Sequence, residues 1–275
     1  MPSRSTKLSP QPGAIGLFDS GIGGLSVAAA VAESLPGEDL LYVADNAHAP
    51  YGPRTAKEIL GYSRAITQSL LTAGCKMIVV ACNTATSLAI DQLRAEHPTV
   101  PFVGLEPAVK PAAQEERIGV LATRATLQSA RYLQLKAKYL AGRRVLEDPC
   151  VGLVPLIESE TPGSVPLRAK LHDILDPMRE AGVTALVLGC THYPMIKEDI
   201  AAVCGPAIRL IDPAPAAARQ VGRVLTAEGL LRKTGGRPTY DFYATGGGGP
   251  LQRTLLRLTG LNQHRTLLVP RTTLA

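Results

Sequence analysis

Short apolar runs alternate with longer stretches of helical spacing along most of the chain. Each run has four or five apolar residues between turn-forming or polar residues, which predicts a buried strand. The expected strands cover residues 14–18, 40–44, 77–81, 118–121, 185–188, 208–211 and 240–244. This regular alternation of strand and helix patterns is typical of an α/β protein with parallel sheets.

Between the strands, apolar residues recur at three- and four-residue intervals, as on helices with one buried face. Helices are expected over residues 25–35, 55–71, 86–97, 216–231 and 251–258, with two more that end near residues 140 and 178. Thr55 and Glu58 have capping-box spacing, which marks the start of the second helix. Residues 150–163 contain proline and are expected to form an irregular connection.

The second half of the chain repeats the pattern of the first. Residues 15–18 match 118–121, and residues 80–84 match 188–192, at offsets that agree to within a few residues. Two similar α/β domains are therefore expected. Their expected boundaries are residues 14–104 plus 213–275 for the first, discontinuous domain and residues 105–212 for the second.

Residues 1–13 are rich in serine, proline and basic side chains, and we expect them to form a disordered lead-in. They contain no apolar segment of the kind that a signal peptide needs, so a cytoplasmic location is expected. No apolar run reaches the length of a membrane span. We therefore expect no membrane association.

The chain of 275 residues has a formal net charge of +6, but its basic residues are dispersed, aromatic residues make up only 4 %, and tryptophan is absent. This pattern argues against direct nucleic-acid binding. The five cysteines are an odd number and widely spaced. They are expected to be reduced thiols rather than a disulfide framework.

Two of the cysteines have a setting that suggests chemistry. Cys82 and Cys190 each follow an apolar strand directly and precede small hydrogen-bonding residues. Polar residues at the carboxyl ends of parallel strands are where open α/β sheets bind ligands. Cys75 and Cys204 lack this setting. For Cys75 and Cys204 we keep the simpler interpretation, a cysteine that only fills space beside a strand, and for Cys82 and Cys190 it remains an alternative.

Two further candidates have alternatives of their own. Asp19 ends the first strand before the glycine-rich turn at residues 21–24, a typical anion site at a helix start, but it could also simply cap that helix. The glycine spacing is not that of a dinucleotide-binding turn, so no NAD is expected. His192, two residues after Cys190, could be structural or a metal ligand, but no second ligand pair lies nearby in sequence.

Two matched thiols suit proton transfer at a stereocentre. Inversion of a carbon requires a base on one face and an acid on the other. The ordinary thiol pKa of about 8.5 can be lowered by a helix N-terminus or a neighbouring positive charge, which would give thiolate at neutral pH. The glycine-rich turn and the polar residues after each cysteine would then hold the carboxylate and amine of the substrate.

Five motifs, in this order, resemble the glutamate racemase family: residues 18–25, 50–54, 81–85, 106–110 and 189–194. The resemblance covers nearly the whole chain from about Gly13. It implies two pseudo-symmetric flavodoxin-like domains with parallel sheets and an active site in the cleft between them. It further implies a homodimer without cofactor or metal that interconverts L- and D-glutamate for peptidoglycan synthesis.

The resemblance also implies roles for individual residues. Cys82 would act as the base on D-glutamate with help from Asp19, and Cys190 as the base on L-glutamate. Glu158 and His192 would assist Cys190. The positions that match the family's substrate-binding residues are Asp19, Ser20, Tyr51, Gly52, Asn83, Thr84, Thr123, Thr126, Thr191 and His192.

The chain departs from the family pattern at residues 44–49 and 246–249, which lie outside the catalytic motifs. Two alternatives remain at this point. One is an aspartate racemase, a related two-cysteine enzyme. The other is a non-catalytic regulator that binds DNA gyrase, because the resemblance implies gyrase inhibition for some members.

Overall fold

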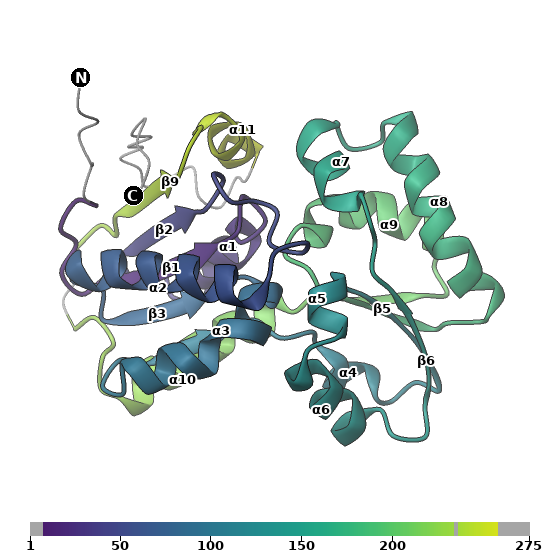
Figure 1. The fold of residues 1–275 in the computed structure, drawn as a ribbon, viewed down its shortest axis with the longest axis horizontal. Helices are drawn as coiled ribbons and strands as arrows, with labels where there is room; N and C mark the ends of the chain where they lie inside the picture. Colours follow the sequence, from purple (N-terminus) through teal and green to yellow (C-terminus); the bar gives the residue numbers. More distant parts are fainter. Residues whose placement is uncertain (1–7, 234–235, 258–275) are drawn as a thin grey trace. The chain divides into compact units, whose positions relative to one another are not determined.

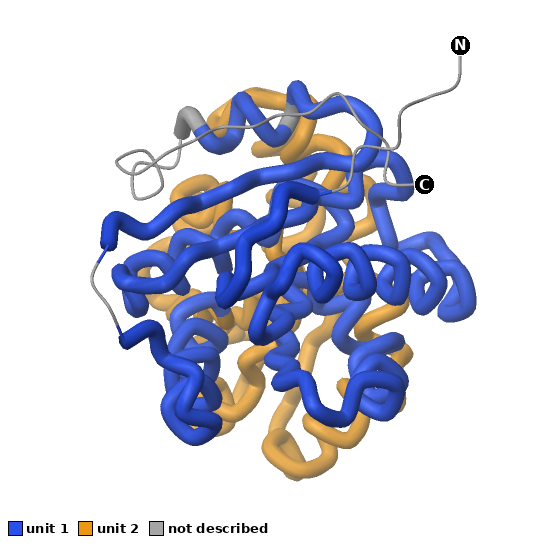
Figure 2. Tube along the Cα trace, turned by 90° about the vertical axis from the view of Figure 1, so that its left-hand side faces the viewer, with its two compact units in different colours: residues 1–105, 214–275 blue, residues 106–213 orange. Residues whose placement is uncertain are grey.

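The computed structural model describes residues 8–233 and 236–257 (Figure 1). The chain forms two compact units, residues 1–105 with 214–275 (unit 1) and residues 106–213 (unit 2) (Figure 2). Unit 1 is therefore built from two separate stretches of sequence. Within the described ranges, no helix combines the length and apolar character needed to cross a bilayer.

Unit 1 contains a five-stranded sheet in the order β4-β3-β1-β2-β9. Every strand pair in it is parallel. Its elements are β1 (Ile15–Asp19), α1 (Leu25–Ser34), β2 (Leu40–Ala44), α2 (Ala56–Thr72), β3 (Met77–Val80), α3 (Asn83–Glu96), β4 (Phe102–Gly104), α10 (Ala214–Ala227), β9 (Tyr240–Ala244) and α11 (Gly249–Arg257).

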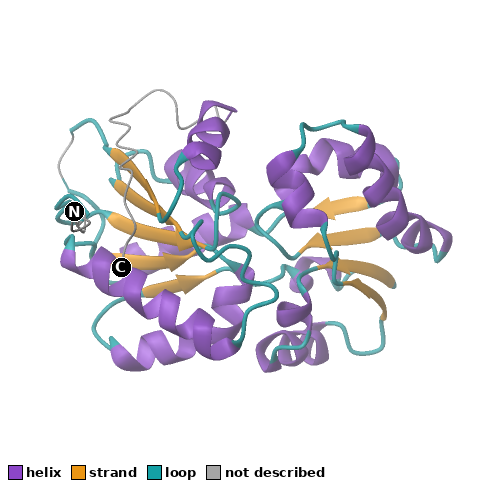
Figure 3. Cartoon of the chain, turned by 45° about the horizontal axis from the view of Figure 1, so that its top comes forward, coloured by secondary structure: helices purple, strands orange, loops and turns teal. Residues whose placement is uncertain are grey.

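Helices cover both faces of this sheet (Figure 3). One face presents Phe18, Val43 and Val80 to apolar residues of α2 and α3, which pack beside each other. The alternate strand residues, including Leu17 and Tyr42, are also fully buried. Since both faces are covered, the central strands are apolar throughout. The predicted capping box forms at the start of α2 between Thr55 and Glu58.

Unit 2 contains a four-stranded parallel sheet in the order β6-β5-β7-β8. Leu121, Leu186 and Leu188 face α7, α8 and α9, while Ile118 and Val120 face α4 and α6. Its elements are α4 (Val109–Ala112), β5 (Arg117–Leu121), α5 (Arg124–Leu127), α6 (Ala130–Tyr139), β6 (Arg144–Asp148), α7 (Leu153–Ser159), α8 (Val165–Glu180), β7 (Ala185–Leu188), the 3₁₀ turn η1 (Tyr193–Ile196), α9 (Lys197–Cys204) and β8 (Arg209–Ile211).

The two sheets share one strand order. Numbered within its own unit, each sheet reads 2-1-3-4, and unit 1 adds β9 beside β2. This is the flavodoxin-like order, in which ligands bind at the carboxyl ends of strands 1 and 3, where the winding reverses. The predicted α/β class with two similar parallel sheets is confirmed. Strands β3 and β7, which precede the two candidate cysteines, are equivalent in this order.

Two local predictions were wrong, and two strands were not predicted. The helix after Cys82 begins at Asn83 rather than at residue 86, because Cys82 itself occupies the N-cap position. Residues 150–163 contain the helix α7. Finally, the short strands β4 and β6 were not predicted; β6 has exposed and half-buried residues, so it lacks the apolar run of a central strand.

The amino-terminal segment differs from its prediction in part. Residues 1–7 of the expected lead-in lie outside the described residues. Residues 8–13 are not disordered: the side chain of Leu8 is buried, and the N–H groups of Gln11 and Gly13 donate to the carbonyls of Ala73 and Gly74. Backbone pairing with the segment after α2 holds this part of the chain against unit 1.

Candidate active site

Cys82 lies at the junction of β3 and α3 and is 4 % exposed. Its Sγ accepts a hydrogen bond from the N–H of Ala85 at 3.5 Å, so the thiol occupies the N-cap position of α3. β1 is the neighbour of β3 in the sheet, and the N–H of Ala81 donates to the carbonyl of Phe18 at 2.8 Å. This pairing brings the end of β1 beside the thiol.

Asp19, the last residue of β1, is fully buried. Its Oδ1 accepts from the N–H of Ser20 at 2.7 Å, and its Oδ2 accepts from the N–H of Gly24 at 2.6 Å. Gly24 directly precedes α1, so the carboxylate satisfies one backbone donor at the start of that helix, where negative charge is favoured. Asp19 therefore has the capping role that the sequence left open, in addition to its position beside Cys82.

Gly24 is required by this close packing. A Cβ at this position would lie 2.7 Å from Cβ of Asp19 and 2.9 Å from the carbonyl oxygen of Ala81. Both distances are shorter than a van der Waals contact, so a side chain here would push the turn away from the ends of β1 and β3. The glycine at this position is therefore needed for packing, whether or not the turn binds an anion.

Burial raises the pKa of the Cys82 thiol well above its ordinary value, and the negative charge of Asp19 raises it further. The N–H groups of Ala85 and Ser20 act in the opposite direction. The expected lowering by the helix N-terminus is therefore present but outweighed by desolvation. The raised pKa favours the neutral thiol, the form that can donate a proton.

Asn83, the first residue of α3, is 2 % exposed, yet neither Nδ2 nor Oδ1 of its amide has a hydrogen-bond partner among the described residues. An unpaired buried amide is costly, and such groups in a folded protein call for an explanation. The amide follows the Cys82 thiol directly in sequence. Both a donor and an acceptor are therefore available for a bound molecule. Thr84, the next residue, is also buried.

Tyr51 and Gly52 lie in the loop between β2 and α2. The hydroxyl of Tyr51 is buried and donates to Oδ2 of Asp45 at 2.6 Å. Burial, followed by the negative charge of Asp45, raises the pKa of Tyr51 far above its ordinary value. Tyr51 therefore stays protonated. It belongs to the same buried cluster as Cys82.

In unit 2, a thiol, an imidazole and a carboxylate form a chain. Cys190 follows β7, and its Sγ lies 3.9 Å from Nδ1 of His192. Nε2 of His192 lies 2.7 Å from Oε1 of Glu158, which α7 supplies. His192 is 3 % exposed. A buried imidazole between a thiol and a carboxylate can accept a proton from one side while the other side orients its ring.

The remaining candidates in unit 2 are threonines. Thr123 follows β5, and its Oγ1 accepts from the N–H of Thr126, which makes Thr123 the N-cap of α5. The two hydroxyl oxygens lie 3.1 Å apart. Thr191 is buried between Cys190 and His192. Thr123 and Thr191 thus follow strands 1 and 3 of the unit 2 sheet, as Ser20 and Asn83 do in unit 1.

The metal-ligand alternative for His192 gains no support from its surroundings. Its Nε2 faces Glu158 and its Nδ1 faces Cys190. Across residues 8–233 and 236–257, no group of three or more histidine, cysteine, aspartate or glutamate side chains is arranged to hold a metal ion.

Asp45, at the carboxyl end of β2, is not among the predicted site residues but contacts one of them. Asp45 is 1 % exposed and contacts the candidate Tyr51 through its carboxylate. Its position at the carboxyl end of β2 was the available signal. Its partners could not be read from spacing, because one of them, Thr245, is 200 residues away.

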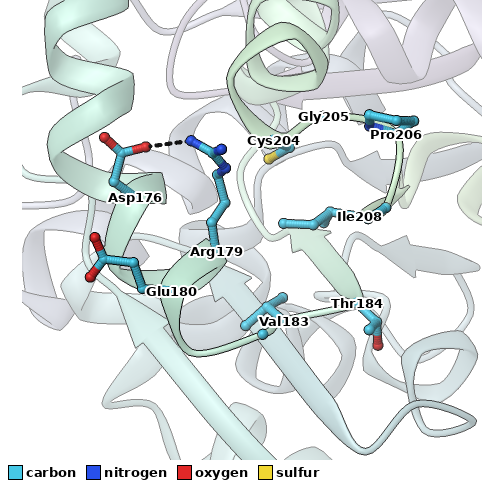
Figure 4. A pocket seen from close by; sticks show the side chains of 11 residues that line it. Asp176, Arg179, Glu180, Val183, Thr184, Cys204, Gly205, Pro206 and Ile208 are labelled. Carbon is cyan, nitrogen blue, oxygen red and sulfur yellow. Dashed lines mark hydrogen bonds and ion pairs between the residues drawn. The ribbon is translucent and has the colours of Figure 1, made fainter.

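A cavity of about 720 Å³ lies elsewhere, at the amino end of β7 (Figure 4). It is lined by the ends of α8 and α9 and includes Cys204 and the ion pair between Arg179 and Asp176. None of its lining residues is a sequence-predicted site residue. Cys190 follows the opposite, carboxyl end of the same strand, so this cavity is separate from the candidate site.

Comparison with known proteins gives a consistent result. The family described as Asp/Glu/Hydantoin racemase matches residues 24–221. The glutamate racemase of Pseudomonas aeruginosa strain PAO1 is 46 % identical over 82 % of this chain and 86 % of its own length. That of Ralstonia nicotianae is 44 % identical over 90 % of this chain and 89 % of its own.

Solved structures agree. A glutamate racemase from Francisella tularensis in complex with D-glutamate has a TM-score of 0.82 and 31 % identity, covering 95 % of this chain and 98 % of that one. An Escherichia coli glutamate racemase in complex with L-glutamate and the activator UDP-MurNAc-ala also has a TM-score of 0.82, with 29 % identity, covering 94 % and 98 %. The resemblance seen in the sequence is confirmed: the chain belongs to the Asp/Glu/Hydantoin racemase family.

Proposed function

We propose that the chain is a glutamate racemase that needs no cofactor and in which Cys82 and Cys190 are the two proton-transfer groups. The observation that carries the proposal is the equivalence of the two thiols: each follows the third strand of a 2-1-3-4 sheet. Each also has an acid–base partner in its own unit, Asp19 for Cys82 and His192 for Cys190. The similarity to glutamate racemases supports glutamate as the substrate.

In the proposed reaction from L-glutamate, the Cys190 thiolate removes the α-proton. The C–H bond breaks, an S–H bond forms, and the electron pair remains on the α-carbon and its carboxylate. The Cys82 thiol then donates its proton to the opposite face, which leaves Cys82 as thiolate and yields D-glutamate. The reverse reaction exchanges the two roles, so no atom or electron is left over.

The surroundings of Cys82 support its role as the acid in this direction. Its raised pKa favours the neutral thiol, the form that donates a proton. His192 would accept the thiol proton of Cys190 to generate the base, with Glu158 stabilising the imidazolium that results.

The polar groups near each thiol would hold the substrate. The unpaired amide of Asn83 offers both a donor and an acceptor, which suits an amino acid with an ammonium and two carboxylates. Ser20, Tyr51, Gly52, Thr84, Thr123, Thr126 and Thr191 complete the proposed substrate-binding set.

The test is incubation of L-glutamate with the purified protein in D2O, followed by chiral separation and detection of α-deuterium. Deuterated D-glutamate is expected, because the acid returns a solvent-derived deuteron to the α-carbon. Cys82→Ser and Cys190→Ser should each abolish racemisation, whereas Cys204→Ser, a buried cysteine outside the proposed site, should not. Unchanged racemisation in both active-site variants would refute the two-thiol mechanism.

The same assay separates the aspartate alternative, because aspartate and glutamate can be offered side by side. Racemisation of aspartate alone would move the substrate assignment to the related enzyme. The gyrase-binding alternative would survive loss of both thiols and is tested by a pull-down with DNA gyrase.

The proposal extends to supply of D-glutamate for peptidoglycan, to a cytoplasmic location and to a homodimer; the resemblance implies the first and the third. Rescue of a bacterium that requires D-glutamate would test the first, and cell fractionation the second. Light scattering of the purified protein would test the third.

A further inference from the structure

The carboxylate of Asp45 binds three side chains from two parts of the chain. Oδ2 accepts from the Tyr51 hydroxyl at 2.6 Å, and Oδ1 accepts from the Thr245 hydroxyl at 2.5 Å. Nδ1 of His48 lies 2.9 Å from Oδ1 and 3.0 Å from Oδ2. Asp45 is only 1 % exposed, so these contacts are largely shielded from water.

His48 is held from three sides. Its ring stacks on the ring of Tyr62, with centroids 3.9 Å apart and planes inclined by 15°. Its carbonyl accepts from Nε of Arg54 at 3.2 Å. The side chain is 35 % exposed, so it is partly accessible to solvent. A carboxylate only accepts hydrogen bonds, so Nδ1 of His48 carries a proton in this arrangement.

The contact with His48 completes the fixation of the Asp45 carboxylate. If His48 were absent, each carboxylate oxygen would accept one hydrogen bond, from Tyr51 or from Thr245, and the carboxylate could still rotate slightly about its Cβ–Cγ bond. His48 bridges both oxygens and removes that freedom. The orientation of the carboxylate sets the position of the Tyr51 hydroxyl and, through the chain, the adjoining Gly52.

We propose that His48 is a positioning residue, which acts through Asp45 on Tyr51 and Gly52 and thereby sets the affinity for glutamate. This inference rests on the proposed function, in which Tyr51 and Gly52 contact the substrate. His48 itself does not touch the reacting atoms. Because the loop would bind substrate and transition state alike, its effect belongs in KM rather than in kcat.

Two substitutions at one position separate positioning from simple packing. His48→Asn places an amide N–H where Nδ1 lies, whereas His48→Leu removes the donor; both lose the stack on Tyr62. We expect His48→Leu to raise KM for glutamate roughly three- to tenfold, the range for the net contribution of one ordinary hydrogen bond, with kcat within about twofold of wild type. His48→Asn should recover most of the wild-type KM.

His172 provides the matched control. Its Nδ1 lies 3.1 Å from Asp176 on the exposed surface of α8, so it forms a similar histidine–aspartate pair outside the proposed site. His172→Leu should leave KM and kcat unchanged. Equal KM values for His48→Leu and wild type would overturn the inference, and so would equal KM values for His48→Asn and His48→Leu that both exceed wild type.

A measurement without turnover keeps the inference separate from the proposed function. In ¹⁵N NMR spectra of the histidine side chains, the signals that disappear in His48→Asn belong to His48. They should show the Nδ1-protonated form in mildly alkaline buffer and lose it in Asp45→Leu, which removes the acceptor. A Nδ1-unprotonated ring would overturn the inference. Wild-type protein that racemises no glutamate would instead overturn the proposed function.

Discussion

Nε2 of His192 and Oε1 of Glu158 lie 2.7 Å apart, although the two residues are 34 positions apart in sequence. The contact links a helix to the segment after β7 and fixes the imidazole beside Cys190. The other ring nitrogen, Nδ1, lies 3.9 Å from Sγ of Cys190, where the proposed function uses it for proton transfer.

Removal of this imidazole should slow racemisation strongly. We expect His192→Asn to lower kcat roughly a hundredfold or more, because a positioned acid–base group contributes about that much. Glu158→Gln keeps an acceptor but loses the charge that stabilises an imidazolium, so a smaller loss of about tenfold is expected. A chiral assay of both variants tests whether His192→Asn loses more kcat than Glu158→Gln.

Glu160, at the end of the same helix, is the control for these two variants. Glu160→Gln should retain wild-type kcat. A Glu158→Gln variant as active as Glu160→Gln would show that the carboxylate has no part in the reaction.

The charge of Asp19 should be visible in the titration of Cys82. Burial and, after it, that negative charge raise the pKa of the thiol, so Asp19→Asn is expected to lower this pKa and to let the thiolate form at a lower pH than in the wild type. Titration of thiolate absorbance, with Cys82→Ser to identify the signal, measures the shift. Asp91→Asn changes an exposed carboxylate on α3 and should have no effect; an unchanged Cys82 titration in Asp19→Asn would contradict the argument.

Asn83 should cost stability in the free protein. Its amide is buried without partners, so Asn83→Ala is expected to raise the free energy of unfolding by about 1 kcal/mol while raising KM for glutamate at least roughly tenfold. Chemical denaturation and steady-state kinetics on the same preparation test both parts.

The contrasting variant lies one turn further along α3. The hydroxyl of Thr86 makes two hydrogen bonds: it donates to the carbonyl of Val80 and accepts from the N–H of Leu105. Thr86→Val should therefore destabilise the fold by about 1–2 kcal/mol. If both variants destabilise equally, the amide of Asn83 has partners in the free protein.

Alkaline pH should destabilise the fold through Cys75. Burial raises the pKa of this thiol to about 12, so above pH 9 the unfolded chain loses a proton that the folded chain keeps. The contribution of Cys75 to the free energy of unfolding is constant below pH 9. Between pH 9 and pH 12 it falls by about 1.4 kcal/mol per pH unit. Urea unfolding at pH 8 and pH 10 should show a smaller loss for Cys75→Ala than for wild type.

Ile78→Val is the control for this effect, because it removes a methylene group near Cys75 without removing a titrating group. The free energy of unfolding of Ile78→Val should be lower than that of wild type at both pH values. Between pH 8 and pH 10 it should fall by the same amount as in wild type. A parallel fall in Cys75→Ala would assign the alkaline loss to other groups.

The extent to which the site could be predicted differs between its parts. Asp19 and Cys82 could be expected at one sheet edge, because each follows an apolar run and parallel strands end together. Glu158 could not be placed on a helix, because Gly152 and Pro155 resemble loop residues. The helix forms since Gly152 adopts φ of 83° just before it and Pro155 lies in the first turn, where a missing N–H costs no helical hydrogen bond.

Tertiary contacts account for what sequence spacing could not show. The partners of Asp45 come from its own loop and from Thr245 after β9, and no local pattern indicates the second. The pKa of Cys82 likewise depends on how deeply the folded chain buries the thiol. Spacing identified the cysteine and the helix start, but desolvation decided the direction of the shift.

The return of the chain to unit 1 has a consequence for synthesis on the ribosome. β2 pairs with β9, residues 240–244, which are translated only after the whole of unit 2. Until they emerge, the outer edge of β2 has no β9 to cover it, and uncovered strand edges invite pairing with other chains. Unit 2, a continuous stretch, meets no such delay. The nascent protein is therefore expected to be most prone to aggregation while its second unit is already folding.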